Sequence, residues 1–271
     1  MQRKDALVKH EELTEVTLAV RGGKNFSFLK HAQINDALPQ TDVDTSDPIG
    51  KVLKTYLEAA ENISTLGSNV KAENKSFLVI KELTCYAPLD HPQFDTWARQ
   101  FRHAILVRKP IDALASFKKV GVEGGGTAYF DVSEAGFREA WLLRSQLAAI
   151  CGPENEAIFL DADNDLLANT RGTLTRLCDH AGVDFDPGML TWSSGPVEEW
   201  QKLKGWHTGA EQSTGFHAAP PTPDEMKTSA AGPPEKRSKR VDYRADPEVI
   251  EGAAACDPYY RAVLQGTIKL A

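Results

Sequence analysis

The stretch AILVRKPIDALASFKK, residues 104–119, decides the fold class of this chain. Its first four residues, Ala104 to Val107, form a continuous apolar run typical of a strand buried on both faces of a parallel sheet. Two basic residues follow, and Pro110 then opens an amphipathic segment that predicts a helix ending at Lys119. A buried strand that passes directly into a helix is the repeating unit of α/β domains.

The same unit recurs on both sides of this stretch. Short apolar runs at residues 77–80 and 157–160 predict two more buried strands. Helices are predicted over Asp47–Leu66, Pro92–Phe101, Asp131–Cys151 and Thr173–Ala181. Strands that alternate with amphipathic helices indicate a parallel sheet with helices on its faces. We therefore predict a single α/β domain over residues 1–216.

The last third of the chain has a different composition. Residues 217–240 contain five prolines among Ala, Ser and Thr and end in the basic hexapeptide EKRSKR, a composition typical of a flexible linker. Residues 241–271 carry apolar side chains at helical spacing, and we expect this segment to pack back on the domain.

Composition excludes several classes of protein. The chain has 271 residues, with 31 Lys and Arg against 38 Asp and Glu, a net charge of -7 that disfavours binding to nucleic acid or an anionic membrane. The four cysteines lie far apart without metal-ligand spacing, so we predict no metal site and no disulfide framework. With no signal-like or membrane-spanning stretch, we predict a cytoplasmic protein with a small-molecule substrate, and a homodimer is left open.

Polar residues follow each predicted strand, and ligands bind beyond the carboxyl ends of strands in an open parallel sheet. Lys81 and Glu82 leave the strand together, and a structural salt bridge or a solvated loop explains them as well as a site does. Arg108 precedes a helix start, an arrangement suited to a phosphate or another anion. Asp161 and Asp163 could bind a metal or act as acid and base, although capping of the next helix is the favoured interpretation.

These motifs resemble a known family. The run Ile105–Pro110 with Ser116, the sequence FLDAD at 159–163, the segment 177–192, Trp206 and the tetrad STGF at 213–216 are similar to sulfotransferases. The resemblance covers about residues 75–216 and is greatest to a bacterial and fungal branch, many of whose members are encoded near natural-product genes. It implies a three-layer fold like that of P-loop NTPases, in which Arg108 and Ser116 hold the 3'-phosphate of the sulfate donor PAPS.

The chain also departs from the pattern of this family. Relatives carry a Gly/Ser-rich phosphate loop, which we place over Val8–Glu15, where this chain has no glycine. Glu11, Glu12 and Glu15 would instead repel an anionic donor. Relatives often have a histidine near the position of Cys85, where it takes the proton of the acceptor hydroxyl, and they tend to have Tyr in place of His207.

Three hypotheses about function follow. In the first, the enzyme keeps the sulfotransferase scaffold but uses no PAPS, and it performs acid–base chemistry such as cyclisation, dehydration or isomerisation of a small natural product. Its predicted catalytic residues are His31, Lys81, Glu82 and His207. In the second, the chain is a PAPS-dependent sulfotransferase that binds the donor through Arg108 and Ser116, with the basic cluster Lys236–Arg240 closing over the nucleotide. In the third, it is a non-catalytic protein that binds a partner.

Overall fold

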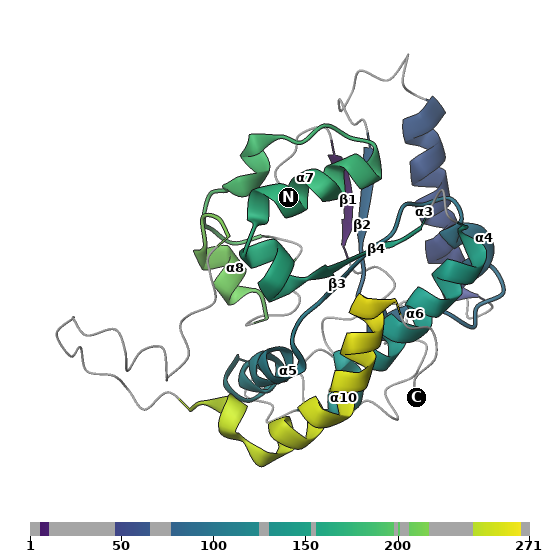
Figure 1. Cartoon of the computed structure of the whole chain (residues 1–271). Helices are drawn as coiled ribbons and strands as arrows, with labels where there is room; N and C mark the ends of the chain where they lie inside the picture. The colour runs from purple at the N-terminus through teal and green to yellow at the C-terminus, as the bar shows by residue number, and fades with distance from the viewer. Residues whose placement is uncertain are drawn as a thin grey trace.

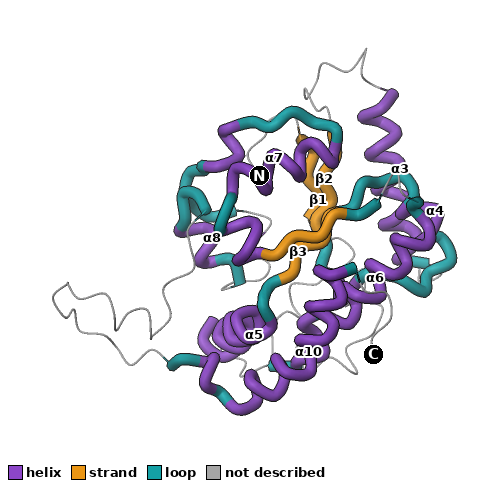
Figure 2. The backbone as a smooth tube through the Cα atoms, in the orientation of Figure 1, coloured by secondary structure: helices purple, strands orange, loops and turns teal. Residues whose placement is uncertain are grey.

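The described strands of the computed structural model form two small parallel sheets, each of two strands (Figures 1 and 2). The model describes residues 6–10, 47–65, 77–124, 130–152, 156–197, 200, 206–216 and 241–266. Strand β1 (Ala6–His10) pairs with β2 (Phe77–Lys81), and β3 (Ala104–Val107) pairs with β4 (Ile158–Asp161). Parallel strands flanked by helices are present as predicted, but in two small sheets rather than one.

Strand β1 corrects the sequence interpretation of the N-terminal region. We placed the start of a phosphate loop at Val8, whereas Val8, Lys9 and His10 continue a strand in register with Val79, Ile80 and Lys81. The strand escaped prediction because its apolar run is only three residues long, and its pairing with β2 cannot be read locally. Glu11, Glu12 and Glu15 lie outside the described residues, as does His31.

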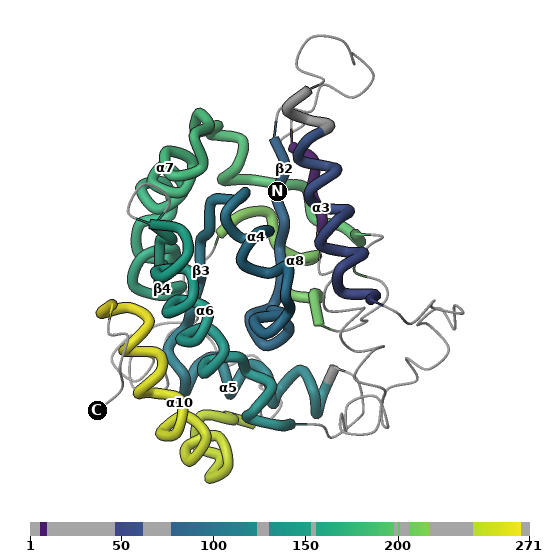
Figure 3. Tube along the Cα trace, turned by 90° about the vertical axis from the view of Figure 1, so that its right-hand side faces the viewer, coloured from purple at the N-terminus to yellow at the C-terminus, as the bar shows by residue number. Residues whose placement is uncertain are grey.

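Helix α3 (Pro48–Thr65) packs against β2 and also contacts α4 (Phe94–Ala98), and Figure 3 shows α3 running alongside β2. Helix α3 begins where the sequence predicts, because the Asp47 carboxylate accepts a hydrogen bond from the Gly50 N–H at 2.9 Å. Its buried face, which includes Leu53 and Tyr56, joins α4 and helix α6 in the main apolar core.

Three predicted helices have different bounds in the structure, and one of them, predicted over Thr173–Ala181, begins three residues earlier at Thr170. Helix α4 is shorter than the predicted 92–101, although its aromatic side chains pack together as expected. The helix predicted over 131–151 is divided into a 3-10 turn (Val132–Ala135) and α6 (Phe137–Ile150). Gly136 separates them at a φ of 74°, and a Cβ there would lie 2.6 Å from the Thr84 hydroxyl. Apolar periodicity continues across this glycine, so the sequence alone does not reveal the break.

Strand β3 and helix α5 (Pro110–Lys119) have the predicted bounds. However, β3 is not buried on both faces as predicted: Ile105 and Val107 are buried, whereas Leu106 is 52% exposed. Among the described residues β3 pairs only with β4, and the face of this small sheet that carries Leu106 is left exposed.

The C-terminal helix α10 (Pro247–Gln265) packs against α5 and α6. Val249 and Cys256 join Leu114 and Phe137 in a second apolar cluster, while Val263 reaches the main core. Helix α7 (Thr170–Ala181) follows β4 and packs through Leu174 and Cys178 in a third cluster, with Met189. The predicted linker 217–240 lies outside the described residues.

None of the helices in the described part of the chain has both the length and the apolar character needed to cross a membrane.

Candidate functional site

The carboxyl end of β4 carries a closed network of hydrogen bonds around Asp161, which is only 3% exposed. Its carboxylate accepts the backbone N–H groups of Asp163 and Asn164 at 2.8 and 2.9 Å, the Asn164 side-chain amide at 3.1 Å, and the Tyr260 hydroxyl. Burial acts to raise the pKa of Asp161, but these hydrogen bonds outweigh it and the pKa is lowered. Asp161 therefore caps the Ala162–Leu167 turn as an ionised group.

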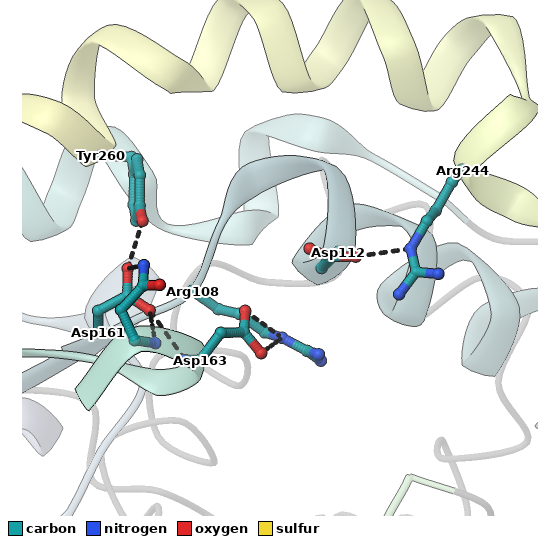
Figure 4. Close-up of polar contacts among 7 residues, drawn as sticks. Arg108, Asp112, Asp161, Asp163, Arg244 and Tyr260 are labelled. Carbon is teal, nitrogen blue, oxygen red and sulfur yellow. Dashed lines mark hydrogen bonds and ion pairs between the residues drawn. The ribbon is translucent and has the colours of Figure 1, made fainter. Parts of the chain in front are cut away.

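Arg108 leaves the neighbouring strand β3 and is held by this turn. Its Nε donates to both carboxylate oxygens of Asp163 at 3.2 Å, and both side chains are about a quarter to a third exposed. In Figure 4 the terminal nitrogens of Arg108 point away from Asp163. The guanidinium thus presents its terminal nitrogens for a further acceptor, in an orientation set by Asp163.

Ser116 lies in the second turn of α5, on its exposed side. The sequence groups Ser116 with Arg108, and the structure places both in one strand–helix unit. No hydrogen bond joins Ser116 to Arg108 among the described residues.

The carboxyl end of β2 carries a second group of polar residues. Glu82 accepts a hydrogen bond from the hydroxyl of Tyr56, a fully buried residue of α3. Burial lowers the pKa of the Lys81 ammonium, against the opposing influence of Glu82 and Cys85. Burial also lowers the pKa of His207, and the positive charge of Lys81 adds to this shift, while Glu211 opposes it. The structure thus brings together Lys81, Glu82 and His207, three of the four predicted catalytic residues.

Aromatic side chains pack beside His207 and on helix α5. The ring centroids of His207 and Trp200 lie 4.7 Å apart, and those of Trp206 and Phe117, on α5, lie 5.6 Å apart. Phe117 in turn contacts Phe130 at 5.5 Å. Half-buried aromatic rings therefore lie both beside His207 and beside the helix that follows β3, and rings of this kind suit an organic ligand.

Sequence analysis missed two tyrosines that shape the site. Tyr56 and Tyr260 both occupy apolar stripes of predicted helices, so they read as core residues. Both rings do pack in the apolar core, but each tyrosine also donates its hydroxyl to a carboxylate at a strand end, Glu82 and Asp161 respectively. Their partners lie 26 and 99 residues away in the chain, and no local pattern signals such a contact.

No set of three or more His, Cys, Asp or Glu side chains in the described residues is arranged to hold a metal ion. Asp161 and Asp163, which could have formed such a site, instead accept hydrogen bonds from the protein itself.

Parallel strands followed by helices define an α/β protein, and its candidate ligand site is the set of polar side chains at the carboxyl ends of the strands. More specifically, a family model described as a sulfotransferase domain matches residues 69–229, more than half of the chain, and the chain belongs to that family. The predicted family resemblance is therefore confirmed. The match includes the ends of β2, β3 and β4 together with His207.

Two curated relatives, both from Arabidopsis thaliana, share part of this region. Branched-chain-amino-acid aminotransferase-like proteins 2 and 1 are 31% and 32% identical to the chain over 118 residues. The matched segment is 42% of this chain but only 19% of each relative, so the similarity concerns about a fifth of those proteins. No solved structure matches the chain.

Proposed function

We propose that this protein is an enzyme that moves a proton on a small organic molecule of natural-product metabolism, using Lys81, Glu82 and His207, without PAPS. One observation carries the proposal: an amine and an imidazole, both with pKa lowered by burial, interact beside a carboxylate that a buried tyrosine orients. Groups shifted in this way at a strand end are a physical signature of acid–base sites.

The division of roles follows from the direction of each shift. A histidine with a lowered pKa is neutral at pH 7, so His207 can take a proton from the substrate. The Lys81 ammonium can stabilise the negative charge that develops, then return a proton to another atom of the substrate. Glu82, which accepts a hydrogen bond from the Tyr56 hydroxyl, stabilises the protonated form of Lys81. Removal and return of one proton accounts for an isomerisation or cyclisation, and loss of water accounts for a dehydration.

His31 stays in the proposal as a fourth acid–base group, although it lies outside the described residues.

A second function, sulfuryl transfer from PAPS to a hydroxyl, is favoured by the terminal nitrogens of Arg108 that point away from Asp163. Family membership supports it as well. Arg108 suits a phosphate on that side only, since Asp163 occupies the Nε side and offsets part of the positive charge. In this reaction His207 would accept the proton of the hydroxyl as its oxygen attacks sulfur in line. The bond from sulfur to the bridging phosphate oxygen of the donor would break, and PAP would leave with that electron pair.

Calorimetry with PAP, the desulfated donor, distinguishes the two functions. The first predicts no binding at micromolar concentration. Micromolar binding that Arg108→Ala abolishes would overturn the first function and support sulfuryl transfer.

A metabolite comparison then tests for catalysis. Extracts of the source cells are incubated with the wild-type chain, and mass spectrometry follows species that isomerise or lose water. Conversion should fall at least about 100-fold in His207→Asn and Lys81→Met, because a positioned proton-transfer group contributes about that much or more. The matched control His91→Asn removes a histidine bonded to Asp47 outside the site and should convert normally. Equal conversion by wild type and His207→Asn would contradict the proposal.

A further inference from the structure

We propose that Tyr260 is a positioning residue through which the C-terminal helix α10 sets the orientation of the Arg108 guanidinium. Arg108 lies at the end of β3, and Tyr260 reaches it through Asp161 and the turn that carries Asp163 (Figure 4). Only the effect on anion binding rests on the second proposed function, in which Arg108 binds the donor, and the inference adds a residue from a distant part of the chain to that site.

The first link is the hydrogen bond from the Tyr260 hydroxyl to Asp161. The Tyr260 ring packs against both the main core and the second apolar cluster, so its position is fixed by packing from two sides. Burial and the negative charge of Asp161 raise the pKa of Tyr260, which keeps the hydroxyl protonated and able to donate.

The second link runs from Asp161 to Arg108. One oxygen of Asp161 accepts the backbone N–H of Asp163, which fixes the start of the turn, while the other accepts the Tyr260 hydroxyl. Asp163 then holds the Nε of Arg108 between its two oxygens, each 3.2 Å away. Each hydrogen bond orients the group that makes the next hydrogen bond. Loss of the bond from Tyr260 to Asp161 should therefore change the orientation of the Arg108 guanidinium.

Helix α10 has other attachments that do not involve this hydroxyl. Arg144 donates to the Val263 carbonyl at 2.6 Å and stacks on Phe159 of β4, with the guanidinium carbon 3.6 Å from the ring centroid. At the other end of the helix, Lys118 donates to Asp246 and Glu248 at 2.8 Å each. Tyr260→Phe should therefore leave α10 docked and remove only the first link.

Nuclear magnetic resonance of the arginine Nε–H groups tests this inference in the whole chain. The Arg108 signal is assigned by its loss in Arg108→Lys. In Tyr260→Phe we expect this signal to shift and its exchange with water to accelerate about tenfold, the effect of weakening a hydrogen bond to a charged group. Two controls should leave it unchanged: Tyr259→Phe, which is on the same helix as Tyr260 but has its ring against Trp141 of α6, and Lys118→Met, which loosens the start of α10.

An unchanged Arg108 signal in Tyr260→Phe would overturn the inference, as would an equal change in Tyr259→Phe, because that would show a general loosening of α10. PAP titration supplies a separate readout. If the wild type binds PAP, Tyr260→Phe should raise its Kd several-fold and Tyr259→Phe should not. If the wild type does not bind PAP, the anion-binding role of Arg108 fails, and the Arg108 signal still decides whether Tyr260 positions this side chain.

Discussion

The ends of β4 and β2 differ in how their polar groups are partnered. At the end of β4, Asp161 accepts hydrogen bonds from four donors, and Asp163 holds Arg108 as an ion pair. At the end of β2, Lys81 and His207 are of like charge when protonated, and burial lowers the pKa of both. A network whose hydrogen bonds are all made, as around Asp161, holds its side chains in one arrangement. Groups whose charged form is destabilised, as in Lys81 and His207, give up a proton more readily. This difference supports the proposal that the first region supports the site and the second performs the acid–base chemistry.

The largest expected effect is at Asp161. Asp161→Ala leaves the buried donors of the turn and of Tyr260 without their acceptor, and we expect the free energy of unfolding to fall by about 3 kcal/mol. Urea unfolding measures this loss. The control Asp179→Ala removes an exposed carboxylate of α7 and should change stability by less than about 0.5 kcal/mol. Similar values for the two variants would remove the basis for calling the β4 end a structural network.

Tyr56→Phe tests the other strand end with a smaller change. Loss of the hydrogen bond to Glu82 should lower the free energy of unfolding by about 1 kcal/mol, because the ring stays buried and only the hydroxyl is removed. Urea unfolding again gives the value. If the β2 end serves chemistry, conversion in the metabolite comparison should fall more steeply than stability. Wild-type conversion in this variant would show that the orientation of Glu82 does not matter.

The dependence of stability on pH should also distinguish the two ends. Burial lowers the pKa of His103, His180 and His207, so the unfolded chain binds more protons than the folded chain just below the ordinary histidine pKa. The free energy of unfolding should therefore fall as the pH drops from 7.5 to 5.5. Between pH 7.5 and 5.5 the Asp161 carboxylate stays ionised, because its pKa is lowered. The stability that it contributes is lost only at lower pH, as the pH falls through that lowered pKa.

Unfolding in urea at the two pH values, with His207→Asn and His103→Asn as single variants, measures this dependence. Each variant should reduce the difference between the two pH values. No difference in the wild-type chain would contradict the lowered pKa of these histidines.

The smallest effect is expected for Lys118→Met, which removes two ion pairs between α5 and the start of α10. Stability should fall by about 0.5 to 1 kcal/mol, and the difference from wild type should shrink at high salt. A loss of several kcal/mol would mean that α10 is attached mainly by these ion pairs. In that case the C-terminal helix would depend on Lys118 more than on its apolar face.

Local signals predicted the elements that local chemistry determines. The bounds of β3 and α5 agree with the sequence because a four-residue apolar run and a proline at the first helical position act within a few residues. Gly136 and the short α4 could not be predicted in the same way. The close approach of Gly136 to Thr84, 52 residues earlier, decides where α6 begins.

The candidate site shows the same division. The rule that ligands bind beyond strand ends directed attention to Lys81, which is the last residue of β2, and to Glu82 and Arg108, which directly follow β2 and β3. The partners of these residues come from other elements: Tyr56 from α3 and Asp163 from the turn after β4. Such pairs depend on how helices pack on the sheets, which periodicity does not specify.

The bond between Tyr260 and Asp161 has a consequence for the order of events during synthesis. The two residues are 99 positions apart, so β3, β4 and the Arg108 turn leave the ribosome well before the helix that completes their network. Until that helix docks, water must take the place of the Tyr260 hydroxyl as a donor to the Asp161 carboxylate. The apolar surfaces that α10 will cover are exposed to solvent during that time. The Arg108 arrangement is thus among the last to form, and the nascent chain gains it only when its C-terminal helix docks.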